Sequence, residues 1–262
     1  MIDARLALRQ ARFTNKAFWR NPASAFFTFA FPLLFLVIFT SFLGNGTALF
    51  VLPSGARFRL EQSTYFVAAM AAFSVITACY TNIAMGVTYQ RDVGILKRTR
   101  GTPLPGWAYM TGRVLQALGV GFLLVVITAA FGIAFYGAHV PTGIDLVRFL
   151  VVLVVGAMSF AALGLATTAA VPNADAAPAV VNGIILPLLF VSGIFFPIDA
   201  TAPQWIRVLG GIFPVKHFAD AMLAGFYGAP LPFHWRDVLI LGAWGVAGLM
   251  LAVRFFSWEP RK

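Results

Sequence analysis

Residues 147–171 read VRFLVVLVVGAMSFAALGLATTAAV, and this run contains a single charged residue, Arg148. About 20 apolar residues in a helix are long enough to cross the hydrocarbon core of a bilayer. No water is available there to bond free backbone groups, so an apolar run of this length should be helical. The run therefore predicts a transmembrane helix.

Five further runs of similar length and composition predict that the chain crosses the membrane six times. Of its 262 residues, 60% are hydrophobic and 11% are charged. Soluble domains carry roughly 25% charged residues, so a soluble fold of this composition is excluded. We predict an all-α membrane protein with one transmembrane domain over 1–262. The predicted transmembrane helices are 23–43, 64–89, 114–136, 147–171, 179–197 and 238–256.

Lysine and arginine are unevenly distributed between the two sides of this predicted bundle. If the N-terminus is cytoplasmic, 13 of these residues lie inside and 6 outside. Cytoplasmic loops of membrane proteins carry such an excess. We therefore expect a multi-pass protein with both termini in the cytoplasm, and its net charge of +10 reflects topology rather than binding of nucleic acid. Without an organelle-targeting signal, the expected location is a bacterial plasma (inner) membrane.

The segment before the first span predicts an amphipathic helix over 1–22. Its basic residues are spaced 4, 3, 4 and 4 apart, which places them in one stripe of a helix. Two interpretations remain open: an interfacial helix that contacts anionic lipid headgroups, or a docking surface for a cytoplasmic partner. The stripe consists of Arg5, Arg9, Arg12, Lys16 and Arg20.

The largest predicted cytoplasmic loop, 90–113, reads QRDVGILKRTRGTPLPGWAYMTGR. A short helix is expected over 91–100, with Val93, Ile95 and Leu96 as its apolar contacts, and Gly101-Thr102-Pro103 should end it. Its charge alone is typical of a solvated basic loop. The apolar residues and the glycine and proline that bound them favour a defined element instead.

The stretch 198–237 is apolar but interrupted by proline and glycine. The two pieces that remain, 202–209 and 215–226, are too short to cross a bilayer. We predict an external re-entrant segment of two short helices, with an amphipathic external loop as the alternative. Lys216 and Asp220, four residues apart, can pair on one helix face.

The sequence lacks several kinds of reactive site. It contains no G-x-x-x-x-G-K-[ST] phosphate loop, no metal-ligand cluster and no nucleophile elbow, so no catalytic, cofactor or metal residue is predicted. The predicted spans contain no Asp, Glu or Lys, although ion-coupled carriers usually keep such groups at membrane depth. Energy for any transport would then come from outside the chain. Candidate pathway residues are Phe35, Phe39, Phe73, Tyr80 and Phe190.

Two segments resemble type-2 ATP-binding cassette (ABC) exporter permeases. Residues 89–109, YQRDVGILKRTRGTPLPGWAY, are similar to the cytoplasmic loop of that family, roughly E-R-E-x-G-T-L-x-x-L-x-x-T-P-L, with Gln90 replacing the first acid and Ile95 the usual threonine. The matching residues are Arg91, Asp92, Gly94, Leu96, Thr102, Pro103 and Leu104. Residues 192–223 resemble the family's segment after the fifth span through Ser192, Gly193, Phe196, Pro197, Pro203, Trp205, Pro214 and Asp220. The chain is similar to drug-export permeases of the daunorubicin-resistance kind.

The resemblance implies a division of labour between chains. A separate cytoplasmic ATPase subunit would bind ATP and Mg and grip a coupling helix over 91–100, so this chain would not be an enzyme by itself. A second permease copy or a paralogue would complete a dimer that exports a lipophilic or amphipathic, drug-like cargo. The alternatives are a lipid-linked glycan or ion exporter of the same family, or a stand-alone channel or carrier. The implied ATPase-coupling residues are Arg91, Asp92, Gly94, Ile95, Leu96, Lys97 and Arg98, and the connecting helix would present Arg5, Arg9, Arg12 and Lys16.

Overall fold

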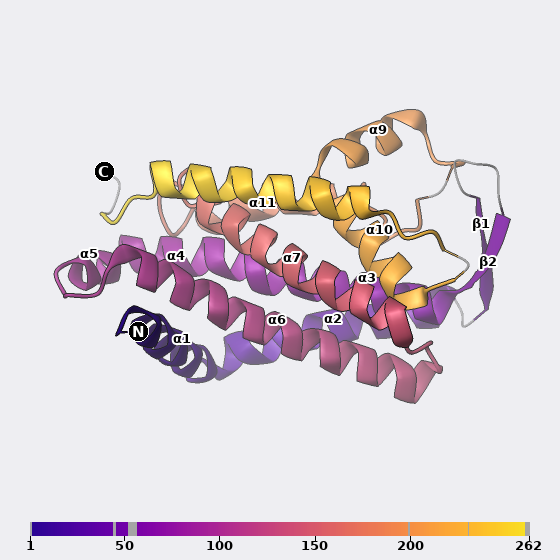
Figure 1. The fold of residues 1–262 in the computed structure, drawn as a ribbon, viewed down its shortest axis with the longest axis horizontal. Helices are drawn as coiled ribbons and strands as arrows, with labels where there is room; N and C mark the ends of the chain where they lie inside the picture. The colour runs from indigo at the N-terminus through magenta and orange to yellow at the C-terminus, as the bar shows by residue number, and fades with distance from the viewer. Residues whose placement is uncertain (1, 44–45, 52–56, 199, 230, 260–262) are drawn as a thin grey trace.

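The computed structural model describes residues 2–43, 46–51, 57–198, 200–229 and 231–259, and in them long helices run side by side along one axis (Figure 1). In chain order the helical elements are α1 (Ile2–Trp19), α2 (Pro22–Leu43), α3 (Gln62–Ile76), the π-helical turn η1 (Thr77–Thr81), α4 (Asn82–Asp92), α5 (Ile95–Arg100), α6 (Gly106–Tyr136), α7 (Gly143–Thr167), α8 (Ala177–Phe190), α9 (Gln204–Ile212), α10 (Pro214–Tyr227) and α11 (Trp235–Phe255).

Among the described residues, five helical stretches are long and apolar enough to cross a membrane. They correspond to five of the predicted spans, with shifted ends. The largest shift is at α6, which starts at Gly106 rather than at residue 114 because Pro105 sets the helix start in an extended conformation. The five stretches are Pro22–Phe42, Gln62–Asp92, Gly106–Tyr136, Gly143–Thr167 and Trp235–Phe255.

The sixth predicted span, 179–197, forms a shorter helix than expected. Helix α8 has 14 residues and ends at Phe190, which corresponds to a length of about 21 Å against the roughly 30 Å of a hydrocarbon core. Turns follow directly, and Gly193 adopts a φ of 89° that favours glycine. The Tyr65 hydroxyl donates a hydrogen bond to the Gly193 carbonyl and fixes this turn against α3. The count of six full-length spans is therefore not confirmed.

The prediction of an entirely helical chain is wrong for the connection between α2 and α3. Strands β1 (Thr47–Val51) and β2 (Arg57–Glu61) form an antiparallel pair in the register Thr47↔Glu61 to Val51↔Arg57. Polar and apolar residues alternate along β2, which is the pattern of a half-buried strand. Leu60 is completely buried, so one face of the ribbon is anchored to the bundle.

The continuous helix from α3 through η1 to α4 is the buried axis of the fold. In the most apolar 18-residue stretch of this helix 83% of the residues are buried, compared with 22% in the corresponding stretches of α2 and α11. Small residues allow the neighbouring helices to approach it. A Cβ atom at Gly164 of α7 would lie 2.7 Å from the Tyr80 carbonyl oxygen of η1, so only glycine permits this contact.

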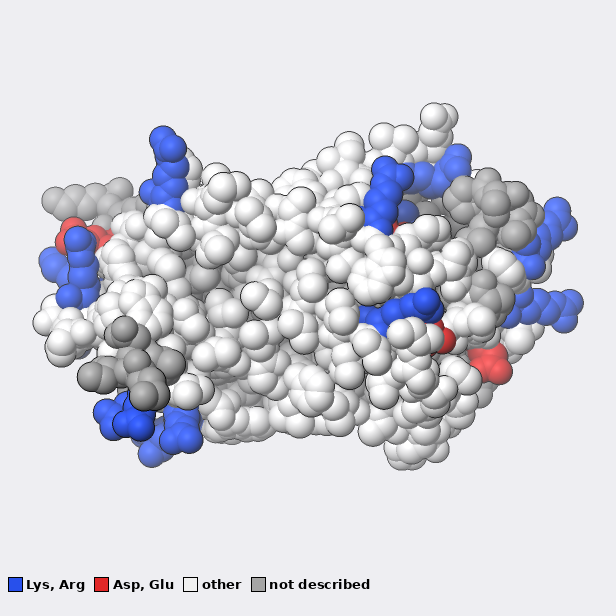
Figure 2. Space-filling view, viewed as in Figure 1, with Lys and Arg blue, Asp and Glu red and all other residues white. Residues whose placement is uncertain are grey.

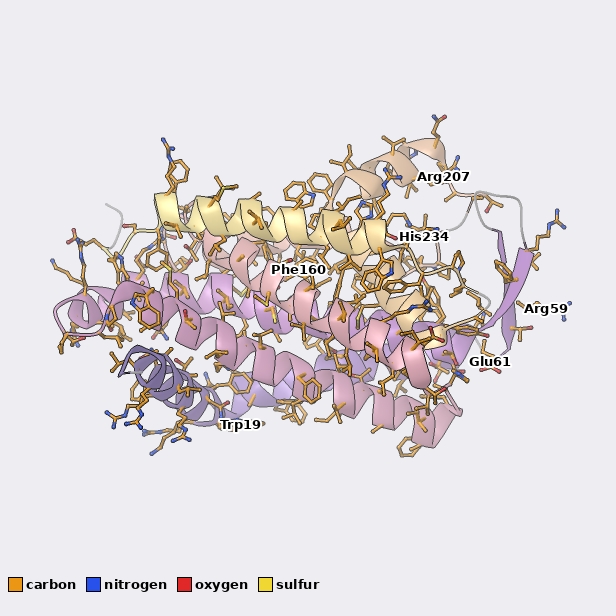
Figure 3. The ribbon with its side chains drawn as sticks, viewed as in Figure 1. Trp19, Arg59, Glu61, Phe160, Arg207 and His234 are labelled. Atoms are coloured by element: carbon orange, nitrogen blue, oxygen red, sulfur yellow. The ribbon has the colours of Figure 1, made fainter. Side chains whose placement is uncertain are left out.

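Charged side chains lie mainly at the two ends of the bundle, and a broad band of uncharged surface separates them on the face shown in Figure 2. Helix α5, the start of α1 and the end of α11 lie at one end (Figure 1). The hairpin and α9, with Arg59 and Arg207, lie at the other end (Figure 3). The start of α1 and the end of α11 thus lie at the same end of the bundle as α5. That this end is cytoplasmic stays a prediction.

The segment after α8 forms two short helices, α9 and α10, close to the predicted pieces. The predicted ion pair is confirmed, with Lys216 Nζ 2.9 Å from Asp220 Oδ2. Helix α10 buries Phe218 and Met222 against α3 and α7, so it belongs to the bundle rather than to a loose external loop. How deeply α9 and α10 enter the membrane stays a prediction.

A second polar contact, which the sequence analysis did not identify, joins α10 to α11. His217 Nδ1 lies 2.6 Å from Asp237 Oδ1, and His217 Nε2 lies 2.9 Å from the Gly211 carbonyl oxygen. The hydrogen bond to Asp237 raises the pKa of His217 above its usual value, and the Gly211 carbonyl and the nearby Asp220 act in the same direction. The protonated imidazole is therefore the form that the fold stabilises.

We expect this contact to make the stability of the outer segment depend on pH. Because the pKa of His217 is raised on folding, the charge-dependent stabilisation is fully present below about pH 6.5 and disappears as the pH rises through the raised value. Asp237→Asn should therefore lower the melting temperature of the detergent-solubilised chain more at pH 6 than at pH 9. Asp145→Asn is the control, because its Arg148 pair contains no histidine. An equal pH dependence for both variants would contradict the assignment.

Candidate functional site

The loop that follows the second span bends at a single glycine. Helix α4 ends at Asp92, and Gly94 has a φ of 75° before α5 begins at Ile95. The prediction of one helix over 91–100 is therefore wrong: Arg91 and Asp92 belong to the end of α4, and α5 is a separate helix of 6 residues. A left-handed backbone is readily adopted by glycine alone, so Gly94 fixes the angle between the two helices.

Arg91 turns into the protein and holds the end of α7. Its side chain is 1% exposed. Nη1 donates to the Thr168 carbonyl at 2.8 Å, and Nη2 donates to the carbonyls of Val171 at 2.6 Å and Pro172 at 3.1 Å. Thr168 is the C-cap of α7, and the last carbonyls of a helix lack an intrahelical partner and carry partial negative charge, so a guanidinium is well suited to bind there. Val171 and Pro172 lie in the connection that follows α7. Arg91 is thus a C-terminal cap supplied by another span.

Asp92 binds the same connection from the other side. Its Oδ2 accepts a hydrogen bond from the Ala174 backbone N–H at 3.0 Å. Together Arg91 and Asp92 grip the segment 168–174 between α7 and α8, and we call this set of contacts the α4–α7 clamp. The sequence analysis placed both residues among the partner-docking contacts. No local pattern could have indicated carbonyl partners about 80 positions further along the chain.

The two apolar residues of α5 have different environments. Leu96 is 0% exposed and packs in the core, whereas Ile95 is 42% exposed. The expectation that both offer an apolar grip to a partner is wrong for Leu96, which anchors α5 to its own chain. The surface that remains free on the loop is mixed apolar and basic, and we call it the loop surface. It consists of Val93, Ile95, Lys97, Arg98 and Arg100.

Helix α1 lies beside α6 at the same end of the bundle (Figure 1). Ala7 and Thr14 are buried in this contact, and the Gln10 side chain packs on Gly112, where a Cβ atom would lie 2.6 Å from Gln10 Cγ. The predicted basic residues Arg5, Arg9, Arg12 and Lys16 are all exposed on the rest of the helix. The structure thus confirms an amphipathic helix, and its polar stripe is free to contact lipid or a partner.

Four of the five candidate pathway residues come together in one aromatic cluster. The ring centroid of Phe35 is 5.9 Å from that of Phe39 and 5.8 Å from that of Phe73, and all three contact Phe195. Phe190 joins through Phe195 at 5.1 Å and forms, with Phe196, the exposed edge of the cluster. The link through Phe195 could not be predicted, because the sequence does not show how the turn after α8 folds back on α2.

Tyr80 lies apart from this aromatic cluster. It is buried in η1 and accepts a hydrogen bond at 3.2 Å from the Thr167 hydroxyl, near the end of α7. Its position favours a role in packing the central helix. Within the described residues, no group of three or more His, Cys, Asp or Glu side chains is arranged to hold a metal ion.

The fold and this site define a multi-span helical membrane protein with a structured basic loop held against its spans. The chain belongs to the ABC-2 type transporter family, whose sequence model matches residues 9–227. The resemblance to type-2 ABC permeases is therefore confirmed. The daunorubicin-resistance kind stays a prediction.

Relatives of the chain carry names that agree with this family. It is 24% identical over 221 residues to the inner membrane transport permease YadH of Escherichia coli K12, covering 81% of this chain and 77% of YadH. It is 21% identical over 246 residues to the transport permease YvfS of Bacillus subtilis 168, covering 93% and 92%. E. coli K12 YbhR, whose name describes a multidrug ABC transporter permease, is 25% identical over 161 residues, or 62% of this chain. The chain spans only 43% of the length of YbhR.

We expect Arg91→Gln to destabilise the protein. The substitution leaves three carbonyls of the segment after α7 without their charged donor, and hydrogen bonds to a charged group contribute about 1.5–3 kcal/mol each. The free energy of unfolding should therefore fall by about 3 kcal/mol or more, measured as a lower melting temperature in detergent. Arg98→Gln removes an exposed charge from the same loop and should change stability by less than about 0.5 kcal/mol. Equal shifts in the two variants would contradict the α4–α7 clamp.

Proposed function

We propose that the chain is the permease subunit of an ATP-driven exporter. It moves a lipophilic or amphipathic cargo outward across a bacterial plasma membrane, and a separate ATPase subunit supplies the energy. The proposal rests on one observation above all: the loop surface is free, while its base is held to two spans by Arg91, Asp92 and Leu96. A loop that only connects two spans would not need these buried contacts at its base.

The chemistry of the loop surface fits a protein partner. Val93 and Ile95 expose apolar groups beyond the end of the bundle, and Lys97 and Arg98 lie next to them. An apolar centre with charged residues at its rim is typical of protein interfaces. The complementary partner is a groove with an apolar floor and an acidic rim. This chain has no phosphate-loop motif, so ATP and Mg belong to that partner subunit.

The α4–α7 clamp provides a route from the loop to the membrane. Helix α4 is continuous with η1 and α3, the buried axis of the bundle. The clamp adds α7 and the segment before α8 to the same unit. A displacement of α5 by its partner would then move spans rather than a flexible loop, which is the requirement for converting ATP hydrolysis into a change of access.

The aromatic cluster is the proposed place for cargo contact. Phe190 and Phe196 are half exposed at the edge of this cluster, whereas Phe73 and Phe195 are buried behind them. Aromatic faces bind lipophilic molecules without fixed polar partners. A second permease copy, identical or a paralogue, would close the pathway over this edge, and both termini would lie in the cytoplasm.

Replacing the apolar part of the loop surface should uncouple the exporter. Val93→Asp combined with Ile95→Asp places charges where an apolar contact is expected. Burying each apolar side chain should contribute about 1.5–3 kcal/mol to the binding free energy, so the double substitution should weaken ATPase binding by at least about tenfold. The measurement is ATP-dependent uptake of a lipophilic dye by inverted vesicles that contain both subunits. Ile95→Val is the control, because it keeps a branched apolar side chain. Leu96 is unsuitable for this test, since its replacement removes a core residue.

Two results would contradict the proposal. One is undiminished ATP-dependent uptake in the doubly substituted variant, despite normal expression. The other is uptake that persists in vesicles from which every ATPase subunit has been removed, because the chain would then transport without an external source of energy.

A further inference from the structure

A groove of about 350 Å³ lies between α1 and α6 and is open on one side. Arg12, Asn15 and Trp19 of α1 form one wall, and Gln116, Gly119 and Leu123 of α6 form the other. Figure 3 shows Trp19 at the end of α1, below the first half of α6. The groove thus lies where an interfacial helix meets a membrane span, away from the loop surface and from the aromatic cluster.

Gln116 is an unusual residue for this wall. Its side chain is only 8% exposed, and it forms no hydrogen bond with any other described residue. Its amide atoms are not among the fully buried, unpaired polar atoms of the described residues, so they are accessible from the groove. Gln116 lines the groove, so a polar atom of an occupant can supply the missing hydrogen bond.

The groove is graded in polarity. Gln10 packs on Gly112, so the first half of α1 lies beside the early turns of α6 and Arg12 is placed near the level of Gln116. Leu123 lies seven residues further along α6, which is about 10 Å deeper into the membrane. The occupant should therefore carry an anion at one end, a hydrogen-bonding group in the middle and an apolar chain at the other end.

Lipid fits this gradient better than a protein segment. The α6 surface around the groove exposes Leu115, Phe122 and Leu123, which would face acyl chains in a bilayer. The outer face of α1 carries exposed Arg9 and Lys16, which favour an anionic membrane surface. Trp19 is half exposed and lines the same groove, where its ring offers apolar surface to an acyl chain.

We propose that the groove between α1 and α6 binds one anionic phospholipid of the adjacent leaflet. The Arg12 guanidinium binds its phosphate, and the Gln116 amide N–H donates to an ester carbonyl. One acyl chain passes over Gly119 toward Leu123. The lipid thus holds the basic helix α1 against a span. The inference does not depend on ATP-driven export.

Gly119 allows a direct test of occupancy. A Cβ atom at this position meets no other atom within 4 Å, so a leucine fits without disturbing the protein but fills the groove. Leucine also has a higher helix propensity than glycine by roughly 0.8–1 kcal/mol, so the variant should fold. Gly242→Leu on α11 is the matched control, because a Cβ atom there also meets nothing within 4 Å.

The experiment is native mass spectrometry of the full-length chain in detergent with added phosphatidylglycerol, phosphatidylcholine or soluble glycerol 3-phosphate. We expect wild type and Gly242→Leu to retain one phosphatidylglycerol in preference to phosphatidylcholine, and Gly119→Leu to lose it. Arg12→Gln should weaken retention about fivefold, from the ~1 kcal/mol that each basic residue contributes at an anionic surface. Arg5→Gln, on the same stripe but outside the groove, should have no effect.

Several outcomes would overturn the proposal. Equal losses in Arg12→Gln and Arg5→Gln would indicate diffuse attraction to the basic stripe instead of a site. Unchanged retention in Gly119→Leu would show that the groove is not the place of binding. Equal binding of glycerol 3-phosphate would reduce the site to a phosphate contact, and equal binding of phosphatidylcholine would exclude selection of an anion. A second protein chain over the groove, seen as a dimer that Gly119→Leu disrupts, would replace the lipid as its occupant.

Discussion

The grip of Arg91 on the end of α7 is the interaction on which the rest of the structure depends. One guanidinium, buried at the end of α4, satisfies three carbonyls of the segment that follows α7. Burying a charge is unfavourable unless its hydrogen bonds are made, so this arrangement tolerates little movement between the two helices. Asp92 binds the same segment through Ala174. The base of the loop surface therefore moves with two spans.

The remainder of the fold extends this rigid unit through the membrane. The helix from α3 to α4 is buried along most of its length, and Gly164 lets α7 approach its π-helical turn. At the far end, α10 packs against α3 and α7, and His217 ties it to α11 through Asp237. A displacement of α5 thus has a continuous, densely packed route to the far end of the bundle, as the proposed function requires.

The sequence determined those features that depend on composition and local spacing. Apolar runs located five of the spans, the spacing of basic residues predicted the exposed stripe of α1, and a separation of four predicted the pair Lys216–Asp220. It could not determine features that depend on distant partners. Arg91 was predicted to be a docking residue because the sequence does not show its carbonyl partners, which lie about 80 positions further along the chain. Leu96 was predicted to be accessible because charged residues surround it in the sequence, but it is buried. The early end of α8 and the contact between His217 and Asp237 likewise follow from tertiary packing.

Rigidity of the α4–α7 clamp can be measured directly by the distance between spin labels at Thr102, which follows α5 outside the loop surface, and Asp175, because both residues are exposed. The labelled permease would be assembled with its ATPase and examined without nucleotide and with ATP trapped. We predict one narrow distance distribution that is the same in both states, while labels on the two permease copies move relative to each other. A distance between Thr102 and Asp175 that shifts by several ångströms, or broadens when ATP binds, would show that α5 moves independently of α7 and would contradict the account.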